Sequence, residues 1–309
     1  MLTLHLLRAF VTLARHESYT PAAKELGVSQ ATLSAQIASL EQAAGLQLCE
    51  HLGGKVRLTS MAQSLLETAR EMVRLADEAS LAMAERAGAE TISRTPVRIA
   101  ADTTVGTYVL PAALGALHRE YPQVQVHMEI GNRAAVVQWL AAGDADLAVM
   151  GQPPELEDLE VEPYLHHELV AFASPNHPLA GLASVPLAQF VAEPFAVRER
   201  GSGTRHAVER LCAEAGVSAR IALELGHNGA VKAAVAAGLG VGIISSVAIE
   251  REVRVGRLAT LNVEGFPLPR RWHIVRRRAR RLSAASNLVL SFLCEQRDAY
   301  GELVYPRRD

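Results

Sequence analysis

The sequence predicts an α/β protein in three parts: an N-terminal winged helix-turn-helix, a long linker helix, and a two-lobed doubly wound domain. Three observations predict this organisation. Two short helical segments meet at a glycine, apolar residues then recur at alternating intervals of three and four, and strand-like and helix-like segments alternate over the rest of the chain. We place the three parts at residues 1–60, 61–90 and 91–309, with lobe I at about 96–167 and 268–300 and lobe II at about 168–267.

The composition is that of an ordinary soluble globular protein, with 49% hydrophobic and 21% charged residues. The net charge of −2 gives no indication of a nucleic-acid partner, so such a partner has to be inferred from pattern. Cys49, Cys212 and Cys294 are odd in number and far apart, which disfavours a disulfide framework or a zinc site. With no signal-peptide pattern and no segment apolar enough to span a bilayer, we expect a cytoplasmic protein without membrane association.

The N-terminal segment has the spacing of a helix-turn-helix. Leu4–His16 is predicted as a helix, and Thr20 and Pro21 suit the N-cap and first position of a second, short helix. Gly27 is expected to end that helix in a left-handed conformation, and Ser29 to cap a third helix. The buried face of the third helix is predicted to consist of Leu33, Ile37 and Leu40. This layout is typical of DNA-binding heads, although helical hairpins with glycine turns also occur in enzymes.

A two-stranded wing is predicted next. Residues His51–Thr59 alternate in polarity across Gly53-Gly54, as expected of a hairpin with a glycine turn. Lys55 and Arg57 place positive charge on this hairpin at alternating positions. A basic wing favours a DNA-binding head over the helical hairpin of an enzyme.

A linker helix follows the wing. Apolar residues from Leu58 to Met83 recur at alternating intervals of four and three, which is a heptad pattern. An amphipathic helix of this kind can lie on its own domain, but small residues on the seam favour close approach of a partner helix. The residues predicted to mediate homodimerisation are Leu65, Ala69, Met72, Ala76, Ala79 and Met83.

The head carries a specific set of residues at characteristic positions: Phe10, Ser18, Ala22-Ala23, Leu26, Val28-Ser29-Gln30, Leu33-Ser34, Ile37, Leu40-Glu41, Gly45, Leu48 and Leu58-Thr59. In these residues the chain resembles the LysR-type transcriptional regulators. It departs from that family at Ala31, Ala35, Cys49, His51 and Ala62, which affects individual contacts rather than the fold. The resemblance implies double-stranded DNA and RNA polymerase as partners and assembly as a homodimer or tetramer.

The third helix is poor in side chains that read bases. Gln30, at its start, is suited to a bidentate contact with adenine, and the outward face offers no arginine for guanine. We therefore expect much of the specificity to come from DNA shape, with the wing on phosphate or in the minor groove. The predicted DNA contacts are Thr20, Ser29, Gln30, Ala31, Thr32, Ser34, Ala35, Ser39, Lys55 and Arg57.

The remainder of the chain alternates strands and helices, which predicts parallel sheets in two doubly wound lobes. Helices are expected around 105–119, up to 142 and over 283–296. The predicted strands are 97–101, 124–130, 146–151, 168–174, 195–198, 221–225, 241–245, about 258–263 and 272–275.

Ligands of open α/β sheets bind at the carboxyl ends of the strands, in the crevice. The residues found there are Thr103, Thr104, Asn132, Arg133, Gln152, Ser202, Thr204, Arg205, His227 and Asn228. The loop Arg200–Arg205 offers glycine amides, hydroxyls and two arginines at a helix start, which suits an anion, although it is also typical of an ordinary helix cap. The set favours a phosphorylated or carboxylated small-molecule effector.

Further segments of this half match a subgroup of the same family: Glu129–Arg133, Met150–Glu155, Gly201–Arg205, Glu224–Asn228 and Val263–Leu268. In these the chain resembles the regulators of the RuBisCO (Calvin cycle) operon, whose effector domain looks like a type 2 periplasmic binding protein. The resemblance implies sensing of a carbon-fixation intermediate or NADPH, with an aromatic or other carboxylic acid as the alternative effector.

The sequence lacks the motifs of common enzymes. It has no Walker loop, GxSxG, HExxH or GxGxxG after a strand, and His166-His167 is not accompanied by other metal ligands. We therefore expect no catalytic residues, no metal and no cofactor. The alternative is a solute-binding protein or an enzyme built on the same two-lobed fold.

Overall fold

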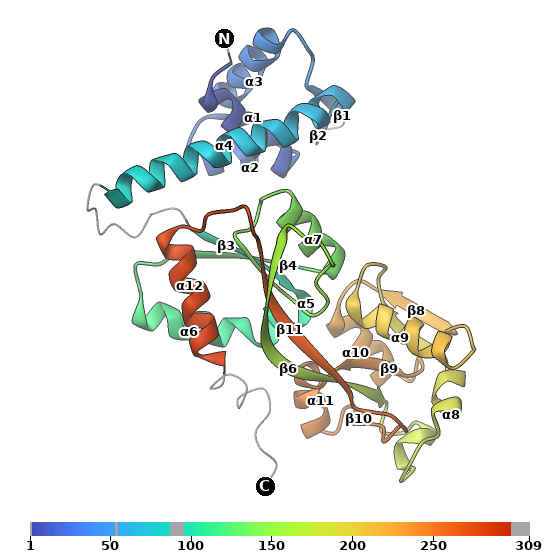
Figure 1. Cartoon of the computed structure of the whole chain (residues 1–309). Helices are drawn as coiled ribbons and strands as arrows, with labels where there is room; N and C mark the ends of the chain where they lie inside the picture. The colour runs from blue at the N-terminus through green and yellow to red at the C-terminus, as the bar shows by residue number, and fades with distance from the viewer. Residues whose placement is uncertain (1, 53–54, 87–95, 298–309) are drawn as a thin grey trace. The chain divides into compact units, whose positions relative to one another are not determined.

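The computed structural model describes residues 2–52, 55–86 and 96–297, and the chain divides into two compact units, residues 1–91 and 92–309 (Figure 1). Within the described ranges, no helix has both the length and the hydropathy needed to cross a membrane.

The N-terminal unit begins with the predicted three helices, α1 (Leu4–His16), α2 (Tyr19–Leu26) and α3 (Gln30–Ala44). Gly27 ends α2 with a φ of 66°, which favours glycine, and the Ser29 hydroxyl accepts a hydrogen bond from the Thr32 amide at 3.0 Å. Both caps are as predicted. The core of the unit contains the fully buried Phe10, Leu13, Leu33, Ile37 and Leu40.

The predicted N-cap of α2 is wrong. The helix starts at Tyr19, and Ser18, with an extended backbone, occupies the N-cap position. Pro21 is therefore the third residue of the helix, still inside the first turn, where its missing N–H costs no intrahelical hydrogen bond. Thr20 is freed from capping: its side chain is exposed and donates to Gln30 Oε1 over 3.4 Å.

The wing is present as the antiparallel pair β1 (Cys49–Leu52) and β2 (Lys55–Leu58), with Glu50 opposite Arg57. It begins two residues before the predicted start. The Val56 amide donates to the Glu17 carbonyl at 2.8 Å, which attaches the wing to the end of α1. The Gly53-Gly54 turn and the Lys55 side chain lie outside the described part of the chain.

The linker is one helix, α4 (Ser60–Arg86), as predicted. The residues of its predicted dimer seam, however, do not all face solvent. Ala62 and Ala69 are fully buried in the core of the head, where α4 packs on α1, so Ala69 is not available to a partner helix. Arg8 of α1 also pairs with Asp77 of α4 through hydrogen bonds of 2.5 and 3.1 Å.

The second unit is built on one sheet with the strand order β10-β6-β11-β5-β3-β4, with β9 also paired to β6. Parallel pairing is confined to β3 with β4 and β5, while β6 and β11 pair antiparallel along their length. The strands are β3 (Val97–Asp102), β4 (Val126–Gly131), β5 (Leu147–Met150), β6 (Leu159–Ala173), β9 (Gly242–Ser245), β10 (Ala259–Thr260) and β11 (Leu268–Arg277).

Lobe I places helices on both faces of β4-β3-β5. One face is covered by α6 (Leu110–Glu120) and α12 (Ala284–Glu295), and the other by α7 (Arg133–Ala141). The predicted helix over 105–119 is two helices, α5 (Thr103–Tyr108) and α6. The break falls at Val109, two residues before Pro111. Pro111 has no N–H to continue the hydrogen bonding of α5, but within the first turn of α6 that missing donor costs nothing.

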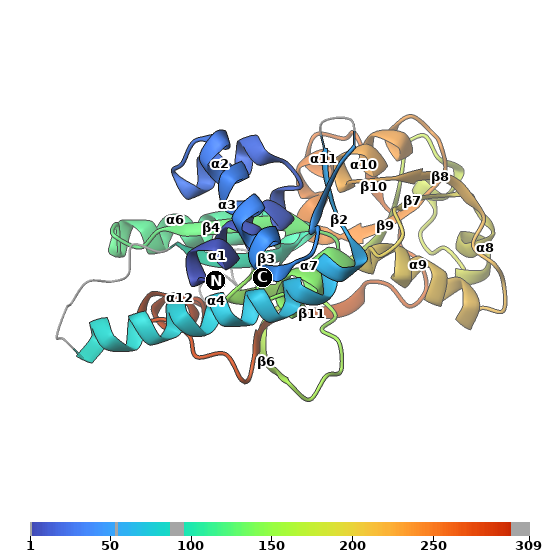
Figure 2. The ribbon, with the colours of Figure 1, turned by 90° about the horizontal axis from the view of Figure 1, so that it is seen from above.

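Lobe II contains a two-stranded parallel sheet and its own helices, which gather at the end of the unit opposite α6 and α12 (Figure 2). Its elements are the 3-10 turns Pro178–Gly181 and Ser246–Ala248, β7 (Phe195–Arg198), β8 (Ile221–Leu225), α8 (Leu187–Ala192), α9 (Gly203–Glu214), α10 (Asn228–Ala236) and α11 (Glu250–Arg254).

The long crossing strands are the main departure from prediction in this unit. The sequence predicted a strand only over 168–174, whereas β6 begins at Leu159 and runs through both lobes beside β11. Its first half lacks a continuous apolar run because Glu160 is only half-buried and the next three residues, Val161–Pro163, are exposed. The lobes therefore share one mixed sheet, and the parallel pair β7-β8 of lobe II forms a small sheet apart from it.

Candidate functional site

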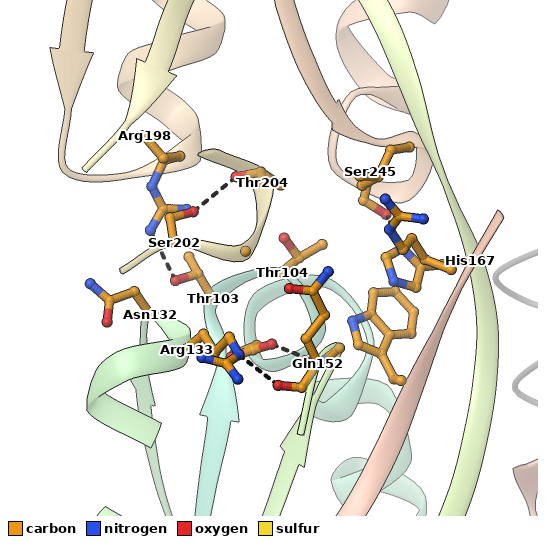
Figure 3. A pocket seen from close by; sticks show the side chains of 16 residues that line it. Thr103, Thr104, Asn132, Arg133, Gln152, His167, Arg198, Ser202, Thr204 and Ser245 are labelled. Carbon is orange, nitrogen blue, oxygen red and sulfur yellow. Dashed lines mark hydrogen bonds between the residues drawn. The ribbon is translucent and has the colours of Figure 1, made fainter. Parts of the chain in front are cut away.

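A pocket lies between the two lobes of the second unit, with about 580 Å³ of space including its open mouth. That size is within the range of small-molecule sites. Figure 3 shows side chains from both lobes converging on it. The pocket is lined by Asp102, Thr103, Thr104, Asn132, Arg133, Gly151, Gln152, His167, Leu169, Arg198, Ser202, Gly203, Thr204, Ser245, Arg270 and Trp272.

The topology of lobe I explains this location. Along the sheet β3 lies between β4 and β5. The chain leaves β3 for α5 and α6 on one face but leaves β4 for α7 on the other, which opens a crevice at the carboxyl ends of these strands. Asp102 ends β3 and Gly151 follows β5. The Gly151 amide donates to Asp102 Oδ2 at 2.7 Å, which joins the two strand ends at the floor of the pocket.

Three arginines face the pocket. Arg133 donates from Nε to the Gln152 carbonyl at 2.6 Å, and no described residue accepts a hydrogen bond from its two terminal nitrogens. Arg198 is buried and bound to Glu199 at 2.7 Å. Burial, followed by the nearby charge of Arg210, lowers the pKa of Arg270. The cationic side chains thus come from both lobes and from a crossing strand.

Hydrogen bonds cross the pocket from one lobe to the other. Arg198 Nη2 donates to Thr103 Oγ1 at 3.2 Å, and Asn132 Nδ2 donates to Glu199 Oε1 at 3.0 Å. The Gly201 carbonyl also accepts from the Ala134 amide at 3.3 Å. A ligand held at Thr103 or Asn132 would therefore touch the contacts that join the lobes.

An aromatic pair forms another wall. The rings of His167 and Trp272 stack with centroids 3.9 Å apart and an interplanar angle of 5°. His167 Nδ1 shares a hydrogen bond with Ser245 Oγ at 3.2 Å. Burial, and then the charge of Arg270, lowers the pKa of His167 to about 3, so this imidazole is neutral at physiological pH.

The structure brings seven of the ten predicted effector residues together in the pocket: Thr103, Thr104, Asn132, Arg133, Gln152, Ser202 and Thr204. Arg205, predicted to bind an anion, does not line it. Its side chain is 6% exposed and pairs instead with Glu209 at 2.7 Å and Glu224 at 2.5 Å. The anion-binding prediction for Arg205 is wrong because its charge is already neutralised within lobe II.

The other two predicted residues also do not line the pocket. His227 is exposed, and its Nδ1 accepts the Ala230 amide at 3.1 Å, so it caps α10. Asn228 is buried behind the pocket, where it accepts from Arg198 at 2.6 Å and donates to Thr104 Oγ1 at 3.1 Å. Asn228 therefore positions two lining residues.

Sequence reasoning missed six polar or aromatic lining residues: Asp102, His167, Arg198, Ser245, Arg270 and Trp272. Asp102, Arg198 and Ser245 end strands β3, β7 and β9, so the same carboxyl-end rule could have found them. The other three lie inside the antiparallel strands β6 and β11, to which that rule does not apply.

The DNA-reading face of the head is exposed as predicted. Gln30, Ala31, Thr32, Ser34, Ala35 and Ser39 of α3 are all exposed, as is Arg57 of the wing. Some of these hydroxyls have intramolecular roles: Ser29 caps α3, and Ser39 donates to the Ala35 carbonyl at 2.8 Å. Thr20 and Gln30, from neighbouring helices, meet at the start of α3. Their contacts with DNA stay a prediction.

The cysteines and histidines form no further site in the part of the chain that the structure describes. Cys49 and Cys212 are buried, and the Cys294 thiol donates to Glu162 at 3.3 Å. Across these ranges, three or more metal-ligating side chains nowhere gather in one cluster. His166 and His167 lie on β6, the strand shared by the lobes.

A winged helix-turn-helix combined with a two-lobed ligand pocket defines a ligand-responsive transcriptional regulator. Comparison with known families specifies the kind. Residues 4–63 match the bacterial regulatory helix-turn-helix proteins of the lysR family, and residues 92–298 match the LysR substrate binding domain. The chain belongs to the LysR family of transcriptional regulators and has that family's effector-binding domain.

Individual relatives agree with this assignment. The RuBisCO operon transcriptional regulator of Allochromatium vinosum is 38% identical over 294 residues, 95% of this chain and 96% of that protein. The regulatory domain of CcmR from Synechocystis PCC6803, in complex with 2-PG, is 33% identical with a TM-score of 0.62, covering 65% of this chain and 97% of that one. Full-length OxyR from Pseudomonas aeruginosa shares the fold at 22% identity, with a TM-score of 0.73 over 98% of this chain and 95% of that one.

Proposed function

We propose that this regulator controls carbon-fixation genes, and that its effector is a small phosphorylated carboxylate bound in the pocket between the lobes. The observation that carries the proposal is the charge of the pocket: three guanidinium groups and several hydroxyl and amide donors face one carboxylate, and of the three arginines Arg198 is paired with Glu199 just behind the lining. The similarity to a RuBisCO operon regulator and to a domain crystallised with 2-PG points to the same chemistry.

The pocket suits an anion for electrostatic reasons. Guanidinium groups bind phosphate and carboxylate oxygens in pairs of hydrogen bonds, and such charged bonds are about twice as strong as neutral ones. Arg133 of lobe I offers two terminal nitrogens. In lobe II, the Ser202 and Thr204 hydroxyls share one hydrogen bond at 2.9 Å, which leaves one hydroxyl hydrogen for a ligand. An anion with two charged ends is able to accept hydrogen bonds from donors of both lobes at once.

The head supports operator binding by a dimer. Gln30 and the small residues of α3 would lie in the major groove, with Lys55 and Arg57 near phosphate. For dimerisation, α4 offers Met72 and Leu75, which are 45% and 51% exposed, beside Leu65 and Ala79. Contact with RNA polymerase, and assembly of dimers into a tetramer, belong to the same proposal.

Titration calorimetry with 2-phosphoglycolate tests the effector class. We expect wild type to bind it, and Arg133→Met to weaken binding about 10-fold to 100-fold, since hydrogen bonds to charged groups contribute about 1.5–3 kcal/mol. Arg257→Met, at an exposed arginine outside the pocket, is the matched control and should bind like wild type. Binding of NADPH or an aromatic acid but not of phosphorylated acids would refute the proposed class.

A further inference from the structure

Asp102 is the one acidic side chain among the lining residues that the structure describes. Its two oxygens differ in environment. Oδ2 accepts the Gly151 amide at 2.7 Å, whereas Oδ1 is buried and receives no hydrogen bond from any described residue. A buried carboxylate oxygen without a donor costs free energy, so the empty acceptor position has to be explained.

The groups around Asp102 come from several elements. Arg133 of α7 and Arg198 of β7 act on its charge, and the neutral His167 of β6 faces the same corner, since a Cβ on Gly151 would lie 3.7 Å from Asp102 Oδ2 and 4.0 Å from His167 Nε2. Burial raises the pKa of Asp102 to about 6, and the Gly151 amide and the two guanidinium groups keep it from rising further. The carboxyl is therefore mostly ionised at neutral pH, and ionised carboxylates only accept hydrogen bonds.

We propose that Asp102 makes this pocket selective for an anionic effector that also carries a hydroxyl group, which donates to Asp102 Oδ1. The inference rests on the proposed function and adds a requirement to it. In this proposal the arginines bind the charged ends of the ligand. The Asp102 carboxylate accepts a hydrogen bond from the ligand's hydroxyl group, which lies between those ends. A ligand without that hydroxyl leaves Asp102 Oδ1 without a hydrogen bond. Its charged groups are then repelled by the Asp102 carboxylate, with no hydrogen bond to offset the repulsion.

Selectivity of this kind is strong. A site built to pair with a ligand hydroxyl rejects an analogue that lacks it, because the buried partner stays unsatisfied. A hydrogen bond to a charged group contributes about 1.5–3 kcal/mol, which corresponds to about 10-fold to 100-fold in affinity.

The test uses two probes that differ only by one hydroxyl: 3-phosphoglycerate and 3-phosphonooxypropanoate. Calorimetry on the full chain at pH 7.5 should give about 10-fold to 100-fold tighter binding of 3-phosphoglycerate. In Asp102→Ala this ratio should fall below about threefold, since alanine offers neither donor nor acceptor. Asp158→Asn, at an exposed aspartate outside the pocket, should keep the wild-type ratio.

The remaining outcomes separate this inference from the proposed function. Equal binding of both probes to wild type overturns the inference and leaves the effector class intact. Tighter binding of 3-phosphonooxypropanoate also overturns it, because the hydroxyl group would then weaken binding rather than strengthen it. If neither probe nor 2-phosphoglycolate binds, the proposed effector class fails, and the inference fails with it. The wild-type ratio decides these outcomes even where a variant is poorly folded.

Discussion

Asp102 links the pocket to the pH dependence of folding. Its pKa is about 6 in the folded chain against 3.8 for an unperturbed aspartate, so the folded state holds the proton more tightly. The stability contributed by this proton is complete below about pH 4 and is lost as the pH rises through about 6. Above that window, ionisation of Asp102 costs at most about 3 kcal/mol of folding free energy.

Replacing Asp102 with asparagine removes this ionisation. We expect Asp102→Asn to unfold at a higher temperature than wild type at pH 7.5, and to lose most of that advantage at pH 4.5. Thermal unfolding of the two ligand-free proteins at both pH values measures the difference, in which the titration of other groups cancels. The same difference at both pH values would show that Asp102 does not titrate in this window.

Gln30 is the residue on which base reading depends most. Gln30→Ala should weaken binding to the cognate operator by about 1–3 kcal/mol while affecting random DNA much less, because phosphate contacts are kept. Gel-shift titrations on both DNAs give the two losses, and Gln42→Ala, at an exposed glutamine near the other end of α3, is the control. Equal losses of affinity for both DNAs would show that Gln30 does not contact bases specifically.

At the residue scale, sequence reasoning succeeded where function follows from strand ends and failed where it depends on orientation. Thr104 and Asn132 were found because they follow parallel strands. Arg205 was mispredicted because its place in a basic, glycine-rich loop does not reveal that its side chain turns toward Glu209 and Glu224. The sequence shows that these glutamates are present, but it does not show that they lie next to Arg205.

At the scale of elements, Arg205 joins α9 to β8 through its ion pair with Glu224. Arg205→Met should lower the unfolding temperature, at a cost of about 1–2 kcal/mol because its glutamate partners are half-exposed, and should leave the affinity for 2-phosphoglycolate within about twofold. Arg210→Met, at an exposed ion pair on the same helix, is the control. A large loss of affinity for 2-phosphoglycolate without a lower unfolding temperature would show that Arg205 contributes to ligand binding after all.

The helix α4 shows how a heptad pattern can serve two partners. Ala62, Ala69 and Val73 pack within the head, while Met61, Met72 and Leu75 are about half exposed. The sequence predicts the helix and its spacing, but it does not show that α1 covers one side. The exposed stripe is therefore rotated from the predicted seam and shares Leu65, Met72 and Ala79 with it.

This stripe gives a prediction about assembly. The double substitution Met72→Glu and Leu75→Glu should dissociate dimers and weaken operator binding at least tenfold, since like charges would face each other across the seam. Light scattering after size exclusion measures the mass. Gln63→Glu, a charge added on another face of α4, should leave the dimer intact; an unchanged mass for the double variant would place dimerisation elsewhere.

Sheet topology was only partly accessible from sequence. The parallel strands β3, β4 and β5 were predicted because their apolar runs alternate with helices. The crossing strands β6 and β11 were predicted only in part, since the exposed stretches between their apolar segments resemble loops. His167 and Trp272 were missed for this reason, as they lie on these strands.

At the scale of the whole molecule, the proposed effector would act on the relation between the two lobes of the second unit. The pocket lies among hydrogen bonds that join the lobes, including Arg198 to Thr103 and Asn132 to Glu199. A ligand changes a protein's conformational equilibrium only through different contacts in the two states. A phosphorylated acid that competes for these donors meets that condition.

The most direct test of the central claim is a measurement of operator binding with and without effector. DNase footprints and bend angles should be determined for wild type and Arg133→Met, at saturating 2-phosphoglycolate for wild type and the same concentration for the variant. We predict that the effector alters the footprint or the bend for wild type only, while both proteins bind the operator equally without it. An unchanged footprint and bend for wild type, under conditions where calorimetry shows the ligand bound, would contradict the account.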